Sequence, residues 1–117
     1  RPWGDTKPEG MEVPKFAENL KKLPGISHVA AICLLDAAGE VVATIEQGGQ
    51  QGSVAVYNHL AQTYGAITPE AARKGLELFA EYAEEEQVNP GTHPNIERLF
   101  VLVEERKTLR TKHVFAV

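Results

Sequence analysis

The most distinctive polar residues of this sequence lie in one segment rich in proline and glycine. Residues 89–95 read Asn-Pro-Gly-Thr-His-Pro-Asn. Proline fixes the backbone φ angle, so the segment presents His93 and Asn95 from a rigid chain. An imidazole and an amide can both donate and accept hydrogen bonds to a small ligand. Arg98 follows closely and adds a guanidinium, which matches the geometry of a carboxylate or a phosphate.

These residues predict one candidate ligand site. We expect His93, Asn95 and Arg98 to form it, with Tyr57 facing them across a cleft, and an anionic small molecule to be its ligand. The same segment also suits a structural role, as a crossover in which Asn95 caps a turn and His93 bonds a carbonyl group. Both interpretations remain open at the level of sequence.

A second candidate site is the glycine-rich stretch 48–52, which leads into a predicted helix. The first N–H groups of a helix lack partners and attract anions, so Gly52 and Ser53 form a candidate anion-binding loop. The nucleotide-binding P-loop requires a lysine between its last glycine and the following serine or threonine. Since no lysine stands there, the alternative is a flexible connector.

The other reactive side chains form no known catalytic pattern. Cys33 is the only cysteine, and its apolar neighbours are typical of a small buried hydrophobic residue. The four histidines lack the spacing of a zinc site, and no serine-nucleophile motif is present. We therefore expect no catalytic residue, no metal and no cofactor.

Length and composition indicate a soluble globular protein. The chain has 117 residues, of which 43% are hydrophobic and 24% charged, which is average for such proteins. The net charge of -4 disfavours binding to nucleic acid or to an anionic membrane surface. No apolar run is long enough to span a bilayer, and a single cysteine suits a reducing compartment. We expect a cytoplasmic protein with neither nucleic acid nor membrane as partner.

The chain is expected to divide into a tail and one domain. Residues 1–13 show neither helical nor strand periodicity and are expected to be a disordered tail, either native or left by cloning. Residues 14–117 are expected to form a single α+β domain.

Hydrophobic spacing predicts three helices in this domain. The first begins at Pro14 and ends before Pro24. The second begins at Ser53 and ends at Gly65, and it buries Tyr57. The third begins at Thr68, where a cap precedes a proline and an acid, and runs to about residue 86. Gly75 lies in the buried stripe of this third helix, which indicates a close approach by a neighbouring element. Three acids at helical spacing, Glu77, Glu81 and Glu85, predict one ridge, which is a docking surface for a basic partner, a weak cation site or a solvated face.

Two hairpins complete the expected fold. The first joins 26–35 to 40–45 through a turn that ends in glycine. The second joins 96–103 to 109–117, although 96–103 also fits a helical stripe. We predict a strand there because residues 100–103 are a β-favouring cluster. The expected order α-β-β-α-α-β-β gives an antiparallel sheet of about four strands with three helices on one face.

Two resemblances follow from particular motifs. The first set of motifs is Leu23-Pro24-Gly25-Ile26, the strand 29–35 and Asp36-Ala37-Ala38-Gly39-Glu40-Val41-Val42. With these motifs, residues 16–64 resemble a roadblock/LC7-type domain, in which a helix leads to a strand, an acidic-glycine turn, a second strand and a helix. Such domains typically dimerise and act as scaffolds for small GTPases or motor complexes, so the resemblance implies a binding module.

The second set of motifs is Gly52-Ser53, Val56-Tyr57, Glu70-Ala71-Ala72, Gly75-Leu76 and the segment 90–96. With these motifs, residues 16–115 as a whole resemble more closely a small family of uncharacterised bacterial proteins. This resemblance implies a bacterial origin and no particular chemistry.

The expected function is that of a noncatalytic protein-binding or homodimerising module. A sheet of about four strands leaves two edges, and no protective proline lies in the expected edge strands, so pairing with a second chain is physically reasonable. The alternative is a small-molecule binding protein or an enzyme that binds an anionic ligand around His93, Asn95 and Arg98.

Overall fold

The computed structural model describes residues 15–116, an α+β domain of five helices and three strands. The α+β class predicted from the sequence is therefore confirmed. The predicted tail and the helix start at Pro14 lie outside the described residues. The elements are α2 (Lys15–Lys21), β1 (Val29–Leu35), β2 (Val41–Glu46), α3 (Gln51–Tyr64), α4 (Pro69–Phe79), α5 (Glu81–Val88), α6 (Pro94–Glu105) and β3 (Arg110–Phe115).

The three strands form one antiparallel sheet in the order β2-β1-β3. The first predicted hairpin is confirmed, and its turn is fixed by Asp36, whose carboxylate accepts hydrogen bonds from the N–H groups of Ala38 and Glu40, both at 2.9 Å. In the central strand Ile32 lies opposite Ile45 on one side and His113 on the other. β1 therefore contributes the middle of the core.

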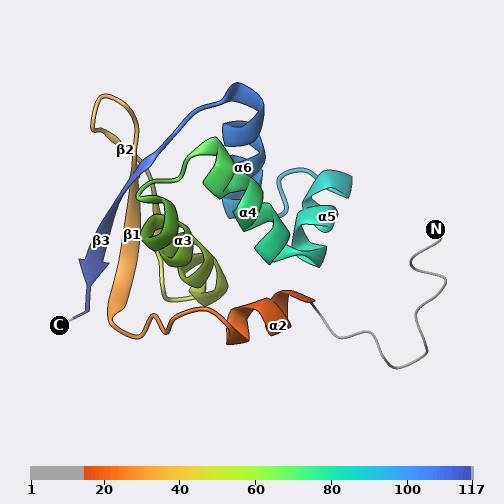
Figure 1. Cartoon of the computed structure of the whole chain (residues 1–117), viewed down its shortest axis with the longest axis horizontal. Helices are drawn as coiled ribbons and strands as arrows, with labels where there is room; N and C mark the ends of the chain where they lie inside the picture. Colours follow the sequence, from red (N-terminus) through yellow and green to blue (C-terminus); the bar gives the residue numbers. More distant parts are fainter. Residues whose placement is uncertain (1–14, 117) are drawn as a thin grey trace.

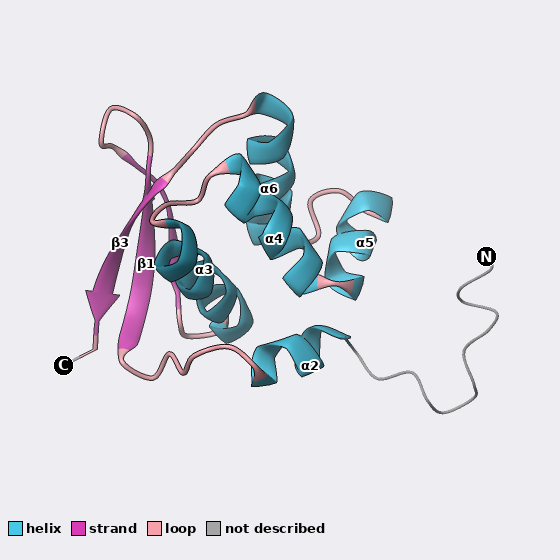
Figure 2. Ribbon diagram, viewed as in Figure 1, coloured by secondary structure: helices cyan, strands magenta, loops and turns pink. Residues whose placement is uncertain are grey.

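All the helices described, α2 to α6, lie on the same face of the sheet, as Figures 1 and 2 show. α3 packs against β1 and β2, and α4 and α6 form the layer behind it. The core lies between the sheet and these helices. Its largest fully buried side chains are Tyr57, Ile32, Leu34, Ile45, Leu60, Ile67 and Leu99.

The segment 96–103 is helical, so the prediction of a strand there was wrong. It belongs to α6, which starts at Pro94 and buries Ile96, Leu99 and Leu102 along one stripe. The helical spacing prevailed over the β-favouring residue types because this stripe packs against α4. The second hairpin is consequently absent from residues 15–116, and β3 pairs with β1 instead.

The predicted helix from Thr68 to about residue 86 is two helices. The chain breaks at Ala80, whose φ of 52° is unusual for a residue other than glycine. Glu77 therefore lies on α4, while Glu81 and Glu85 lie on α5, and the predicted acidic ridge is interrupted. This break and α6 account for five described helices where three were expected.

Gly75 is where three helices meet, which confirms the close approach predicted for it. A Cβ atom at this position would lie 2.8 Å from Cδ1 of Leu99 and 2.9 Å from Cδ1 of Leu60. The glycine of α4 thus lets leucines of α6 and α3 approach its backbone. None of the helices within residues 15–116 has the length and apolar character needed to cross a membrane.

Candidate functional site

Three of the four residues predicted to bind a ligand, Tyr57, Asn95 and Arg98, lie together at the junction of α3 and α6. The Tyr57 hydroxyl donates to the backbone oxygen of Asn95 at 2.6 Å and accepts from Nη1 of Arg98 at 3.3 Å. Nη1 of Arg98 also donates to Oδ1 of Asn95 at 2.9 Å. The guanidinium carbon lies 6.0 Å from the centre of the Tyr57 ring. These hydrogen bonds join α3 to the first turn of α6.

Tyr57 is a permanent donor in this cluster. Burial raises the pKa of Tyr57 to about 12, against the opposing effect of the Arg98 charge. The phenol therefore stays protonated at neutral pH and keeps its bond to Asn95. The hydrogen bonds assign Tyr57 and Arg98 a structural role, and a ligand role for them stays a prediction.

His93, the fourth predicted residue, faces α5 instead. It occupies the N-cap position of α6 without a capping side-chain bond. Its Nε2 atom is hydrogen-bonded to Oε1 of Glu85, and its ring meets the Tyr82 ring edge-on at 5.5 Å. His93 thus ties the crossover loop to the preceding helix.

Glu86 is an important residue that the sequence analysis missed. Its exposed fraction is only 2%. Its two carboxylate oxygens accept hydrogen bonds from the N–H groups of Gly91 and His93, each at 2.6 Å. The Gly91 bond is the largest cause of a lowered pKa of Glu86, His93 lowers it further, and burial opposes the change. The available signal was an acid a few residues before a Pro-Gly turn, where N–H groups need acceptors.

We predict that Glu86→Gln destabilises the protein at neutral pH, because an amide accepts at only one of the two positions and its NH₂ group would face a backbone donor. The lowered pKa of Glu86 means that its stabilisation is complete above the ordinary value of 4.5 and is lost as the pH falls below that value. Urea unfolding measures the free energy of unfolding of both proteins at about pH 7 and about pH 4. The difference in this free energy between wild type and variant should be smaller at the lower pH. A constant difference would contradict the assigned role of the carboxylate.

His113 is a polar residue on the helix-covered face of the sheet. Its Nε2 atom is hydrogen-bonded to Oδ1 of Asn58 on α3 at 2.9 Å. Burial lowers the pKa of His113, and the charge of His28 lowers it further. Among residues 15–116, no group of three or more histidine, cysteine or acidic side chains is arranged to hold a metal ion.

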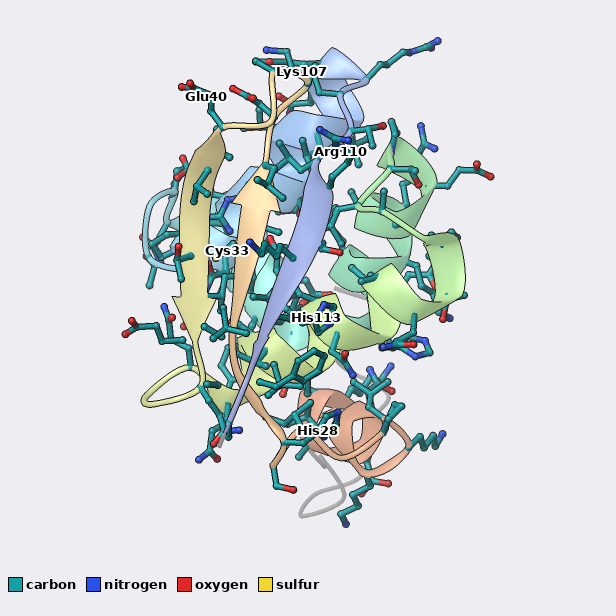
Figure 3. All side chains as sticks on the ribbon, turned by 90° about the vertical axis from the view of Figure 1, so that its left-hand side faces the viewer. His28, Cys33, Glu40, Lys107, Arg110 and His113 are labelled. Atoms are coloured by element: carbon teal, nitrogen blue, oxygen red, sulfur yellow. The ribbon has the colours of Figure 1, made fainter. Side chains whose placement is uncertain are left out.

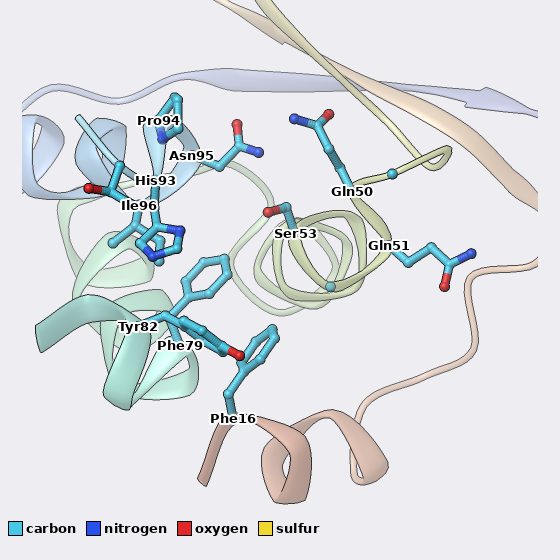
Figure 4. A pocket seen from close by; sticks show the side chains of 13 residues that line it. Phe16, Gln50, Gln51, Ser53, Phe79, Tyr82, His93, Pro94, Asn95 and Ile96 are labelled. Carbon is cyan, nitrogen blue, oxygen red and sulfur yellow. The ribbon is translucent and has the colours of Figure 1, made fainter. Parts of the chain in front are cut away.

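A pocket of about 330 Å³ brings the two predicted sites together. Gly52 and Ser53, from the predicted anion-binding loop, line it along with His93 and Asn95. Figure 4 shows Ser53 and Asn95 on one side of the space and the rings of Phe16, Phe79 and Tyr82 on the other. The remaining lining residues are Gly49, Gln50, Gln51, Thr92, Pro94 and Ile96. Neither Tyr57 nor Arg98 lines this pocket.

The aromatic wall depends on a glycine of α3. Phe16 stacks on Phe79 at 5.3 Å and meets Tyr82 edge-on at the same centroid distance. A Cβ atom at Gly52 would lie only 2.8 Å from the Phe16 ring. Gly52 thus allows Phe16 of α2 to pack beside the first turn of α3, and this contact closes one end of the pocket.

The fold and its polar clusters define a small α+β domain with one helix-covered and one uncovered sheet face. Its family is shown by comparison of the sequence with family models: the chain belongs to the DUF2322 family, described as an uncharacterized protein conserved in bacteria, whose model matches residues 16–113. The predicted resemblance to an uncharacterised bacterial family is confirmed, and that to roadblock/LC7-type domains stays a prediction. No curated protein and no solved structure matches the chain.

Proposed function

We propose that this protein is a noncatalytic module that binds a second copy of itself through the uncovered face of its sheet. The observation that carries this proposal is the residue type on the outer side of the central strand. Ile32 and Leu34 point toward the helices, so the alternating positions Ala31, Cys33 and Leu35 point away from them. Figure 3 looks onto this face, with Cys33 near its middle.

The apolar character of this face extends onto the neighbouring strands. Val42 of β2 is 52% exposed and Val114 of β3 is 42% exposed. An antiparallel sheet with one face in water normally carries polar residues on that face. The same face also carries Thr44, Glu46, Arg110 and Lys112, so it is mixed in character. Five apolar outward positions gathered on three adjacent strands still favour a face that is covered in the functional state. The outward residues are Ala31, Cys33, Leu35, Val42 and Val114.

Charge favours a second copy as the partner. Glu46 lies on the β2 side of the face and Lys112 on the β3 side, with β1 between them. A twofold axis parallel to β1 would lay β2 of each copy over β3 of the other. Glu46 of one copy then lies opposite Val114 of the other copy, with Lys112 two residues along the strand. The two faces are self-complementary in this arrangement.

The size of the face sets the expected strength of association. Three strands of this length, about 4.8 Å apart, cover an area of about 300 Å². This is well below the roughly 800 Å² per partner of a standard stable interface. We therefore expect a weak dimer that exchanges rapidly with monomer, rather than an obligate dimer.

Sedimentation velocity of the full chain, from about 1 μM to about 1 mM, tests the proposal. We predict that Val114→Glu weakens dimerisation by roughly tenfold or more, because it places a carboxylate opposite Glu46 of the other copy. Adding Glu46→Lys to this variant should restore part of the affinity, since opposite charges then face each other.

Val88→Glu is the matched control. Val88 lies on α5, is 76% exposed, and receives the same substitution and the same charge change far from the sheet. Its dimerisation should equal that of wild type. Monomer throughout the wild-type concentration series, or equal weakening by both glutamate variants, would overturn the proposal.

A further inference from the structure

We propose a second binding site, independent of the sheet face: the pocket with the aromatic wall binds an uncharged sugar. Its volume of about 330 Å³ falls at the lower end of the range of known ligand pockets. Figure 4 shows aromatic rings of α2, α4 and α5 on one side of it and polar side chains of α3 and α6 on the other. A sugar ring has the same two characters, because its C–H groups form an apolar face and its hydroxyl groups form a polar edge.

The aromatic wall matches the apolar face of such a ligand. Phe79 is 3% exposed and forms the buried part of the wall, while Tyr82 is 39% exposed and open to solvent. The face of an aromatic ring is electron-rich, so it attracts C–H groups that carry a partial positive charge, as those beside the oxygen atoms of a sugar do. The wall can therefore hold a sugar ring as well as exclude water from it.

The arrangement of the rings distinguishes a sugar from a flat aromatic ligand. A nucleobase or a similar ring is held best when aromatic side chains stack on its faces. The rings of Phe16 and Phe79 are inclined by only 19° with centroids 5.3 Å apart, so they stack on each other and leave no slot between them. A sugar needs one aromatic surface only, because hydrogen bonds hold its polar edge.

The polar wall is made of side chains that both donate and accept hydrogen bonds. It contains the amides of Gln50, Gln51 and Asn95 and the hydroxyl of Ser53. The hydroxyl groups of a sugar also donate and accept, so they can pair with these side chains in either direction. Gln51 is exposed and Ser53 is half-buried, so a ligand reaches both by displacing water.

The charges around the pocket favour an uncharged ligand. Among the described residues that line it there is no lysine, arginine, aspartate or glutamate. The carboxylates next to the aromatic wall are bound within the protein, since Glu81 accepts from the N–H group of Phe16 at 2.9 Å and Glu85 is hydrogen-bonded to the ring of His93. A charged ligand would lose its water here without gaining an ion pair.

Titration of the full ¹⁵N-labelled chain with neutral monosaccharides, followed by NMR, tests this inference. The probes are glucose, galactose, mannose and N-acetylglucosamine. We expect at least one of them to cause saturable shifts of the amide signals of residues 51–53 and 95–96, with roughly millimolar affinity. Sorbitol carries similar hydroxyl groups on an open chain without a ring face, and it should bind about tenfold more weakly or less.

Tyr82→Ala is the decisive variant, because it removes the exposed ring of the aromatic wall. The affinity for the bound sugar should fall by roughly tenfold or more. Tyr64→Ala is the matched control: Tyr64 is 38% exposed, lies on α3 and does not line the pocket, so the affinity should equal that of wild type. Ser53→Ala removes one hydroxyl of the polar wall and leaves the aromatic wall intact, and it should lower the affinity by about threefold to tenfold.

The absence of saturable shifts with all four sugars would overturn the inference. Equal affinity for sorbitol and the sugars would do so as well, because the aromatic wall would then contribute nothing. The same holds for an equal loss in the two tyrosine variants. If Tyr82→Ala fails to fold, Ser53→Ala decides, and an unchanged sugar affinity in that variant contradicts the assigned site.

Discussion

Leu99→Ala is expected to lower the free energy of unfolding by about 2–5 kcal/mol, the usual cost of emptying a fully buried leucine site. Leu99 is 0% exposed and lies where α6 meets Gly75 of α4. The helix backbones around it are fixed by other contacts, so the cavity cannot close completely. Chemical denaturation of wild type and variant measures this difference.

A second substitution at Gly75 shows whether the cavity is where the structure places it. In the wild type, Gly75→Ala gains about 1 kcal/mol of helix propensity. It also forces a Cβ atom to within 2.8 Å of Leu99, and such overpacking costs about 1–3 kcal/mol. In the Leu99→Ala background the overlap with Leu99 is gone and only the one with Cδ1 of Leu60, at 2.9 Å, remains. The same substitution should therefore be clearly less unfavourable there than in the wild type.

The four proteins form a double-mutant cycle with an expected coupling of about 1 kcal/mol or more. Additive effects of the two substitutions would show that α4 and α6 do not meet at these residues. Such a result would contradict the packing of the helix 94–105 against α4.

Tyr57→Phe is expected to destabilise the protein by about 1–2 kcal/mol, because it removes a buried donor and one acceptor of a charged group. The lost contacts are the 2.6 Å bond to the Asn95 carbonyl and the 3.3 Å bond from Arg98. The ring itself still fills its place in the core. The loss therefore measures the hydroxyl alone.

Tyr64→Phe is the control for this prediction. Tyr64 belongs to the same helix, is 38% exposed, and loses the same hydroxyl group. Its stability should stay within about 0.5 kcal/mol of wild type. If both variants lose the same free energy, the bonds between α3 and α6 are not the cause.

Local sequence signals were sufficient to predict the elements that are stabilised by contacts between residues close together in the chain. The first hairpin follows from an aspartate and a glycine in its turn, and Gly39 has the positive φ of 84° that such turns use. The start of α4 follows from Thr68, whose hydroxyl accepts from the N–H group of Ala71 at 3.0 Å. Each of these features is completed within a few residues, so it can be recognised without knowledge of the rest of the fold.

The candidate sites could be predicted only as separate pieces. Gly52 and Ser53 were selected as the start of a helix, and His93 and Asn95 as parts of a rigid crossover. Their meeting in one pocket depends on the packing of α6 beside α3, which no local pattern contains. Tyr57 and Arg98 were correctly predicted to lie close together, but their side chains contact each other and do not line the pocket.

The sequence by itself determined the α+β class, the first hairpin, the start of α4 and the close approach at Gly75, because each depends on local turn chemistry or on hydrophobic period. The predicted start at Ser53 was wrong, since α3 begins at Gln51. Tertiary structure decided the secondary structure of 96–103. Its apolar residues have a spacing that fits both a helix and a strand, and the chain adopts the one in which neighbouring elements bury these residues. It also decided the break at Ala80 and the burial of Glu86, where a carboxylate is stabilised by two N–H groups of a loop that only the folded chain holds in place.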